Sequence, residues 1–314
     1  MIGQMMARAR ALGWAISLFL MVAPVPVLAD GAAALRQAMR LASAGDWDGA
    51  AGAAQGAGQV GADIIIWQRL RAGDGRLGDY EDFIARRADW PGMGLLKEKG
   101  EEAVARSTDP GRVVAFFTGR VPETAEGSLA LINALRALGR GPEAEAEAFR
   151  AWTELPFSAA EEQALLGIYG DALRVAHEVR LDRLLWQNRV AEAKRMLPRV
   201  GPGWQALAQA RMALRADADG VNALIDRVPA DMQADPGLAY ERFDWRFRRD
   251  MDDEAAELVI AQSQSAAALG DPEAWAERRA ALARSLLRAD KPKAAYRVAA
   301  VSYTHLTLPT ILRV

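Results

Sequence analysis

The stretch RLDRLLWQNRVAEAK, residues 180–194, contains the structural unit that recurs along this chain. Leu181, Leu184 and Leu185 share one face at helical spacing, and the helix that they predict ends near Asn188. The Ala-rich sequence AEAK then begins a second helix, whose small side chains allow it to approach the first helix closely. The stretch therefore predicts a helical hairpin.

The same unit, a helix with bulky apolar residues, a short turn and an Ala-rich helix, recurs along the sequence. Its turns fall near residues 45, 140, 188, 250 and 290. A hairpin of this kind cannot bury its apolar face alone, so neighbouring hairpins must stack. The intervals between turns are unequal, whereas a regular tetratricopeptide array repeats about every 34 residues. We therefore predict an all-α fold over residues 30–300: an irregular helical-hairpin solenoid, an α-superhelix that is TPR-like but degenerate.

The three consecutive isoleucines at residues 64–66 are β-branched and by composition could form a short strand. They run through Trp67 directly into QRLR (68–71), which consists of good helix formers. We therefore predict that this segment is the start of a helix with a buried face.

The composition excludes several classes of function. The formal net charge is −2, so no strong positive field indicates binding to nucleic acid. The chain contains no cysteine, which excludes thiolate metal sites, thiol nucleophiles and disulfide frameworks. We predict no cofactor.

Residues 1–29 have the pattern of a secretory signal peptide. Arg8 and Arg10 form a positive start, an apolar stretch covers residues 12–27, and the sequence VLA supplies small residues for cleavage after Ala29. An uncleaved membrane anchor is the alternative, but the apolar stretch is short for a spanning helix of about 20 residues. We therefore expect the mature protein in the periplasm, without a transmembrane segment.

Side chains that carry catalytic chemistry are scarce. The chain has two histidines, His305 and His177, and we interpret His177 as a surface residue or a satisfied partner on a helix. No Ser-His-Asp triad and no Gly-rich phosphate loop after a strand can be assembled. Adjacent carboxylates point about 100° apart on a helix and form no catalytic pair, so we expect them to be solvated residues of first helical turns. These pairs are Glu101–Glu102, Glu161–Glu162 and Asp252–Asp253. We predict no catalytic, cofactor-binding or metal-binding residue.

Nine tryptophans occur in the chain, and an aromatic ring can stack on a sugar. In a stack of helices, however, a tryptophan at helical spacing is more often a core residue. We therefore predict core packing for Trp67, Trp186, Trp245 and Trp275.

Three groups of motifs carry a resemblance to a known family. The first group is WQRLR (67–71), YEDF (80–83) and DWPG (89–92). The second group is RLDRLLW (180–186), AEA (191–193) and ARMAL (210–214). The third group is DPGLAYER (235–242), WR (245–246), WAERR (275–279) and AAY (294–296). In this order, over most of residues 60–300, they resemble the N-terminal U-shaped superhelical domain of the soluble lytic murein transglycosylases. Ala276 departs from the family, which often has a second tryptophan there.

The resemblance implies a periplasmic enzyme that acts on peptidoglycan. The family cleaves the β-1,4 bond between N-acetylmuramic acid and N-acetylglucosamine, and the muramoyl 6-hydroxyl attacks to leave a 1,6-anhydro end. One catalytic Glu, in a Glu-Ser motif followed by a Gly-Leu-Met-Gln segment, belongs to a separate C-terminal lysozyme-like domain. Neither motif occurs in this chain. The resemblance therefore implies a scaffold that holds peptidoglycan glycan strands near a catalytic site outside it, and it identifies no protein partner.

The last residues, 301–314, abruptly lose the Ala- and Arg-rich composition of the rest. The sequence VSYTHLTLPT at the start of this tail resembles the translation of a transposase adapter used in sequencing libraries. We therefore expect a non-native tail and a native gene that continues differently after codon 300. A real, β-prone C-terminal segment is the alternative.

Two other functions remain open from the sequence. A non-enzymatic periplasmic adaptor, which binds a partner protein in a helical groove, agrees with every feature up to the stack of hairpins. The DWPG and DPGL motifs favour the transglycosylase family over that adaptor. A lipid-bound structural protein of the cell wall is disfavoured because the chain lacks the cysteine that would carry the lipid.

Overall fold

The structure, a computed structural model, describes residues 27–300. Between these limits the chain is all helical and contains no strand, which confirms the predicted fold class. The chain divides into two compact units, one ending at Asp74 and the other beginning at Gly75. The expected signal peptide up to residue 26 and the expected tail, 301–314, lie outside the described residues.

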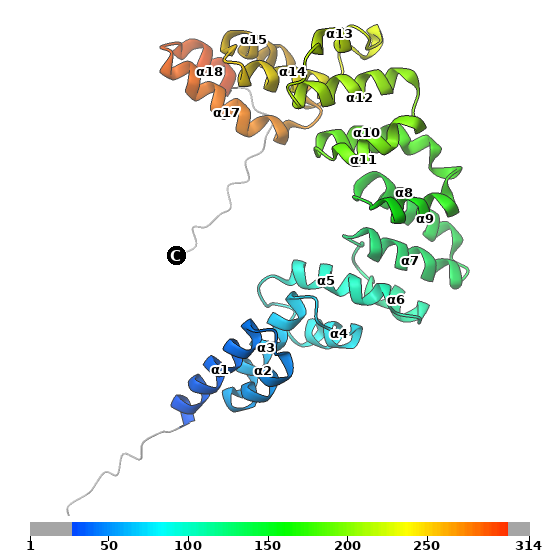
Figure 1. Cartoon of the computed structure of the whole chain (residues 1–314), viewed down its shortest axis with the longest axis vertical. Helices are drawn as coiled ribbons and strands as arrows, with labels where there is room; N and C mark the ends of the chain where they lie inside the picture. The colour runs from blue at the N-terminus through cyan, green and yellow to red at the C-terminus, as the bar shows by residue number, and fades with distance from the viewer. Residues whose placement is uncertain (1–26, 301–314) are drawn as a thin grey trace, which may run out of the picture. The chain divides into compact units, whose positions relative to one another are not determined.

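In its described part, residues 27–74, the first unit consists of three α-helices joined by short turns (Figure 1). These are α1 (Val27–Ser43), α2 (Trp47–Ala54) and α3 (Gly58–Arg71), with a 3₁₀ turn at Gln55–Ala57 before α3. Alanines of α1 and α2 pack with Ile65 in a common core, so these helix axes approach closely. The isoleucines at 64–66 lie inside α3, which confirms the helix predicted there, although it begins earlier in the sequence.

The second unit contains the remaining helices of residues 75–300. They are α4 (Leu77–Arg86), α5 (Met93–Ala105), α6 (Pro110–Phe116), α7 (Ala125–Ala137), α8 (Gly141–Glu154), α9 (Ala159–Tyr169), α10 (His177–Trp186), α11 (Val190–Met196), α12 (Pro202–Arg215), α13 (Val221–Ile225), α14 (Pro236–Arg248), α15 (Asp252–Gln262), α16 (Ala266–Leu269), α17 (Pro272–Arg288) and α18 (Pro292–Ala300).

Hairpins of the second unit stack on their neighbours in chain order. The hairpin pairs include α7 with α8, α10 with α11, α14 with α15, and α17 with α18. Between hairpins, α8 packs on α10, α10 on α12, α12 on α14 and α14 on α17, as can be followed in Figure 1. The fold of this unit is therefore solenoid-like, with each hairpin burying its apolar face against the next one.

The turns between helices share one backbone conformation. Asn188, Asp250 and Asp290 have φ values of 58°, 58° and 57°, and glycine takes the same left-handed region at Gly45 and Gly139. In each case the next amide donates to a carbonyl five residues earlier, for example from residue 189 to residue 184 at 2.8 Å. This is the Schellman cap, in which glycine avoids the penalty for positive φ and asparagine or aspartate tolerates it. The turns predicted near 45, 140, 188, 250 and 290 are confirmed, and a further cap of this kind occurs at residue 217.

Candidate functional site

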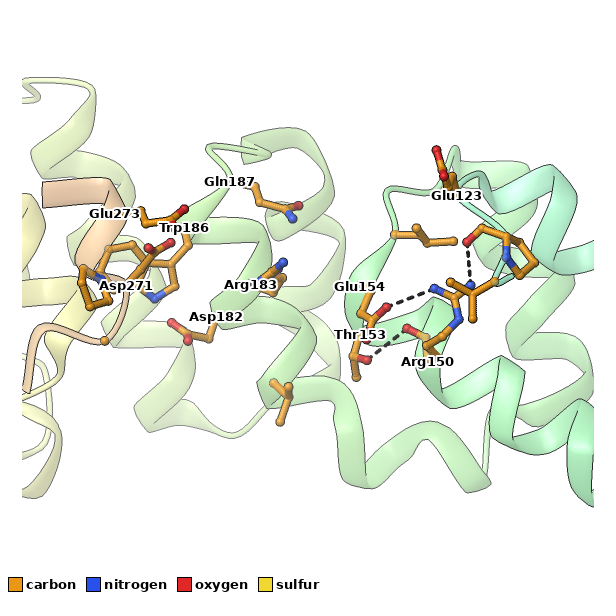
Figure 2. A pocket seen from close by; sticks show the side chains of 16 residues that line it. Glu123, Arg150, Thr153, Glu154, Asp182, Arg183, Trp186, Gln187, Asp271 and Glu273 are labelled. Atoms are coloured by element: carbon orange, nitrogen blue, oxygen red, sulfur yellow. Dashed lines mark hydrogen bonds and ion pairs between the residues drawn. The ribbon is translucent and has the colours of Figure 1, made fainter. Parts of the chain in front are cut away.

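A cavity of about 1170 Å³ opens on the second unit. Four segments line it: residues 121–123 before α7, the C-terminal end of α8, one face of α10, and residues 270–273 at the start of α17. Figure 2 shows these segments around the cavity, with Trp186 near one end and Arg150 near the other. Residues far apart in the sequence therefore meet at one surface, which combines polar and apolar side chains.

Helix α10 forms the central wall of the cavity. Val179, Arg183 and Gln187 lie along one side at intervals of four residues, and Asp182 and Trp186 line the same wall. Residues with this spacing share a helix face. The opposite face carries leucines 181, 184 and 185, which are buried in the core. The apolar stripe that anchors α10 therefore also determines which of its polar side chains face the cavity.

Trp186 is half-buried and is held on several sides. The guanidinium carbon of Arg211 lies 5.2 Å from the centroid of its ring, and the ring of Tyr240 lies 5.5 Å away, centroid to centroid. A Cβ added at Gly270 would lie 3.0 Å from Cζ2 of Trp186 and 2.7 Å from Cβ of Pro236. Gly270 also has a φ of +71°, so this position requires glycine for both conformation and space. The indole ring is consequently fixed at the cavity wall.

Arg211 supports this wall from inside the protein. Its side chain is 1% exposed, donates a hydrogen bond to Asp182, and lies 3.6 Å from the carboxylate of Asp235. A buried guanidinium needs such carboxylates, because its transfer from water is otherwise very costly. Asp235 also accepts a hydrogen bond of 2.7 Å from the Leu238 amide and caps α14. Burial raises the pKa of Asp235, and the charge of Arg211 opposes that rise.

Arg150 joins helices at the other end of the cavity. Its guanidinium is paired with Glu147 at 2.6 Å and with Glu154 at 3.0 Å. It also donates to the carbonyl of Pro122 at 2.9 Å and to the hydroxyl of Ser128 at 3.1 Å. Figure 2 shows the bonds to Glu154 and to the loop before α7. The guanidinium of Arg150 is therefore paired within the protein and is poorly available to a ligand.

Other polar side chains of the cavity are available to a ligand. Among the described residues, Arg183, Gln187 and Glu273 have no hydrogen-bond or ion-pair partner for their side chains. Glu123 is exposed as well, and Asp271 accepts one hydrogen bond, from the Ala274 amide at the start of α17. The cavity thus combines a fixed aromatic ring with open carboxylate, guanidinium and amide groups. Such a mixture suits a polar ligand that also has an apolar face.

Of the two alternatives expected for His177, a surface residue or a satisfied partner on a helix, the surface alternative is wrong; Nδ1 of its ring is buried and has no hydrogen-bond partner among the described residues. His177 is 5% exposed, and its ring lies 5.5 Å from that of Trp152, centroid to centroid. Burial lowers its pKa, and the charges of Arg199 and Arg180 act in the same direction. The side chain belongs to the core beside Trp152 and lies away from the cavity. His305 lies outside the described residues.

The expectation that paired carboxylates are solvated is wrong for two of them. Glu101 is 1% exposed and accepts hydrogen bonds from the amides of Glu123 and Thr124, at 2.9 and 2.8 Å. It therefore holds the N-terminus of α7, a role that depends on how α5 and α7 pack and has no local sequence signal. Glu162 is likewise buried and is paired with Arg195 at 2.7 Å.

The pair Asp252–Asp253 agrees better with the expectation of solvated carboxylates in a first helical turn. Asp252 and Asp253 lie in the first turn of α15, where the helix dipole favours negative charge. Asp253 is exposed and is paired with Lys291 at 2.6 Å.

The prediction of core packing for the tryptophans is confirmed for Trp275. Its side chain is 1% exposed and its indole N–H donates to the carbonyl of Leu269 at 3.0 Å. Trp67, Trp186 and Trp245 are half-buried and lie at the edge of the core, and Trp245 packs against the apolar cluster of α12 and α14. Trp186 is the site residue that the pattern misassigned, because the leucine stripe of α10 places it at the edge of the core and not within it.

Within residues 27–300 no helix is long and apolar enough to cross a membrane. The same residues contain no group of three or more His, Asp or Glu side chains arranged to hold a metal ion. No protein-family model, no curated protein and no solved structure matches this chain.

Proposed function

We propose that this chain is the scaffold part of a lytic transglycosylase, which holds peptidoglycan glycan strands in the periplasm. The observation that carries the proposal is Trp186, a ring fixed at the wall of a cavity with polar and apolar lining residues by Arg211, Tyr240 and the Gly270 loop. The sequence motifs of residues 60–300 support the same family.

A sugar ring has an apolar face of C–H groups and a polar rim of hydroxyls. The apolar face can stack on Trp186, as an aromatic side chain supplies a flat apolar surface. Arg183 and Gln187 stand beside that ring on α10 and can bond the hydroxyls of the rim. The cavity, at about 1170 Å³, exceeds the roughly 300–1,000 Å³ of ordinary small-molecule sites. It therefore suits several linked sugar units better than one.

The proposal assigns no catalytic residue to this chain. Cleavage of the β-1,4 bond to give a 1,6-anhydro end would be carried out by a Glu-Ser-containing domain. The family resemblance puts that domain C-terminal to the helical part. Export would depend on the signal peptide predicted at residues 1–29.

The direct test is calorimetric titration of the full chain with N-acetylglucosamine oligomers, together with co-sedimentation with purified sacculi. We expect binding that Trp186→Ala weakens roughly two- to tenfold, the range for loss of one aromatic contact. Trp245→Ala is the matched control, since Trp245 is also half-buried but lines a different pocket. Equal losses in both variants, or no binding by the unaltered chain, would overturn the proposal.

A periplasmic adaptor is the second candidate, and one observation favours it. Val121 and Val179 border the cavity with 57% and 59% of their surfaces exposed, and open apolar side chains suit a protein partner. An adaptor without glycan affinity would give no titration signal with sugar oligomers and only background co-sedimentation with sacculi. The same experiment therefore separates the two functions.

A further inference from the structure

Charge is distributed unevenly around the cavity. Five carboxylates line it against two guanidinium groups, and one of the two, that of Arg150, is paired with Glu147 and Glu154. Arg211, which lies behind Trp186, is likewise matched by two carboxylates, those of Asp182 and Asp235. Arg183 is thus the one cavity cation in the described chain that is left without a partner.

The negative charge reaches the aromatic end of the cavity. Asp271 and Glu273 lie at the start of α17, and Gly270, the neighbour of Asp271, is in contact range of Trp186. Figure 2 shows both carboxylates beside the indole ring, whereas Glu123 and Arg150 stand at the opposite end. Asp271 is the N-cap of α17 and Glu273 lies in its first turn.

A sugar stacked on Trp186 would present its ring substituents to these two carboxylates. A neutral acetamide gains at most an ordinary hydrogen bond there. A free amine is protonated and makes a charge-assisted bond, which is about twice as strong, and the aromatic ring attracts a cation as well. We infer that the Trp186 end of the cavity takes a glycan unit with a free, protonated amine, such as de-N-acetylated glucosamine, in preference to the N-acetylated unit. This inference rests on the proposed function, because it concerns the same glycan site.

The expected size of the preference for the free amine depends on how exposed the two carboxylates are to solvent. Pairs between open, solvated charges change an equilibrium by about two- to fivefold each. Two carboxylates should therefore give roughly a tenfold preference for the amine. Because such pairs are screened, the preference should shrink as salt is raised.

The test is a titration of the full chain with two tetramers, of glucosamine and of N-acetylglucosamine, at about pH 6, where carboxylates are ionised. The variant is Asp271→Asn with Glu273→Gln, which keeps the side-chain shapes and leaves a good N-cap at 271. The control is Glu254→Gln with Glu257→Gln, which removes the same charge from the exposed surface of α15. Thermal melting of each variant checks that it folds.

We expect the glucosamine tetramer to bind about tenfold more tightly, and this preference to disappear in the cavity variant and at high salt but not in the control. Equal affinity for the two tetramers, or tighter binding of the N-acetylated one, would overturn the inference while leaving the proposed function intact. Absence of binding by both would overturn the proposed function itself. Tetralysine is the third ligand to be titrated. If it binds as tightly as the glucosamine tetramer, and if Trp186→Ala does not weaken its binding, the site is one for basic peptides and the inference is wrong.

Discussion

The guanidinium of Arg211 occupies the space that a side chain at Gly237 would fill. A Cβ at residue 237 would lie 2.1 Å from Cζ of Arg211 and 2.2 Å from one of its Nη atoms. Gly237 lies in the first turn of α14, and Arg211 comes from α12. The absence of one side chain thus allows a buried cation to reach Asp182 and to stand behind Trp186.

Gly237→Ala is therefore expected to destabilise the protein. The added methyl group must displace Arg211, whose side chain is only 1% exposed. Overpacking of this kind costs about 1–3 kcal/mol. Chemical denaturation measures the free energy of unfolding, and glycan titration is expected to show weaker binding because Trp186 loses its support.

Gly94→Ala is the matched control for that substitution. Gly94 occupies the same position in the first turn of α5, and an added Cβ there meets nothing within 4 Å. Alanine has the higher helix propensity, so this variant should be unchanged or up to about 1 kcal/mol more stable. If both variants behave alike, the steric relationship between Arg211 and Gly237 has no energetic consequence.

Gly270→Ala tests the loop that holds the indole ring. Alanine at this position would adopt a φ of +71° and bring its Cβ to 3.0 Å from Trp186. Gly270 has a ψ of −67° and so lies outside the left-handed helical region. We expect alanine to lose about 1–3 kcal/mol from backbone strain, together with weaker glycan binding and an altered near-ultraviolet circular dichroism spectrum from a displaced tryptophan.

Gly139→Ala separates backbone strain from steric contact. Gly139 has a φ of +74°, and an added Cβ meets nothing within 4 Å. This control should lose about 1–2 kcal/mol, the cost of the left-handed conformation, while keeping glycan affinity and the aromatic spectrum of the unaltered chain. Unchanged glycan affinity in Gly270→Ala would show that the loop does not position Trp186.

Local features of the sequence were sufficient to predict the helices and most of their connections. Gly45, Gly139 and Asn188 are residues that tolerate positive φ, and each follows a helix with a regular apolar stripe. The helix propensity of QRLR also correctly outweighed the β-branched isoleucines before it. These signals act over a few residues, so no knowledge of tertiary packing was required.

The cavity could not be predicted in the same way. Asp182, Arg211 and Gly237 meet in space but are separated by many residues, and their pairing depends on the order in which α10, α12 and α14 stack. The burial of Glu101 has the same origin, because its partners are amides that precede α7. A pattern that treats each helix alone assigns such a glutamate to solvent.

The stability of the protein should depend on pH through Glu101. Burial raises the pKa of this carboxyl, and hydrogen bonds from Thr124 and Glu123 reverse only part of the rise. The native state then holds the proton more tightly than the unfolded chain, whose glutamates titrate near 4.3. Stability should therefore fall as pH increases from about 4.3 through the raised native pKa. Glu101→Gln cannot titrate, so the difference in unfolding free energy between wild type and variant should change across this window. If the unfolding free energies of wild type and Glu101→Gln changed in parallel with pH, the raised pKa of Glu101 would be contradicted.

Thr124 links Glu101 to the helix that it supports. Its hydroxyl donates to Glu101 at 2.6 Å and accepts from the Gly127 amide at 3.0 Å, which makes it the N-cap of α7. Thr124→Val keeps the shape but removes both bonds, and a lost N-cap costs about 1–2 kcal/mol. Thr124→Ser retains the hydroxyl and should lie close to wild type in denaturant titrations. A serine variant as unstable as the valine variant would instead assign the effect to lost packing of the methyl group.

The chain by itself is expected to release no 1,6-anhydro-muropeptides from purified sacculi. A lytic reaction needs a carboxylic acid placed to protonate the leaving oxygen, and such acids are generally shielded from solvent and free of a strong cation. In the cavity, Glu154 and Asp182 are held by arginines, Glu123 and Glu273 are open to solvent, and Asp271 is engaged as the N-cap of α17. Mass spectrometry of the soluble fraction, with a hydrolytic muramidase as the positive control for release, measures the outcome. Detection of anhydro ends would show that this chain carries catalysis, and Glu154→Gln and Asp182→Asn would then identify which cavity carboxylate acts.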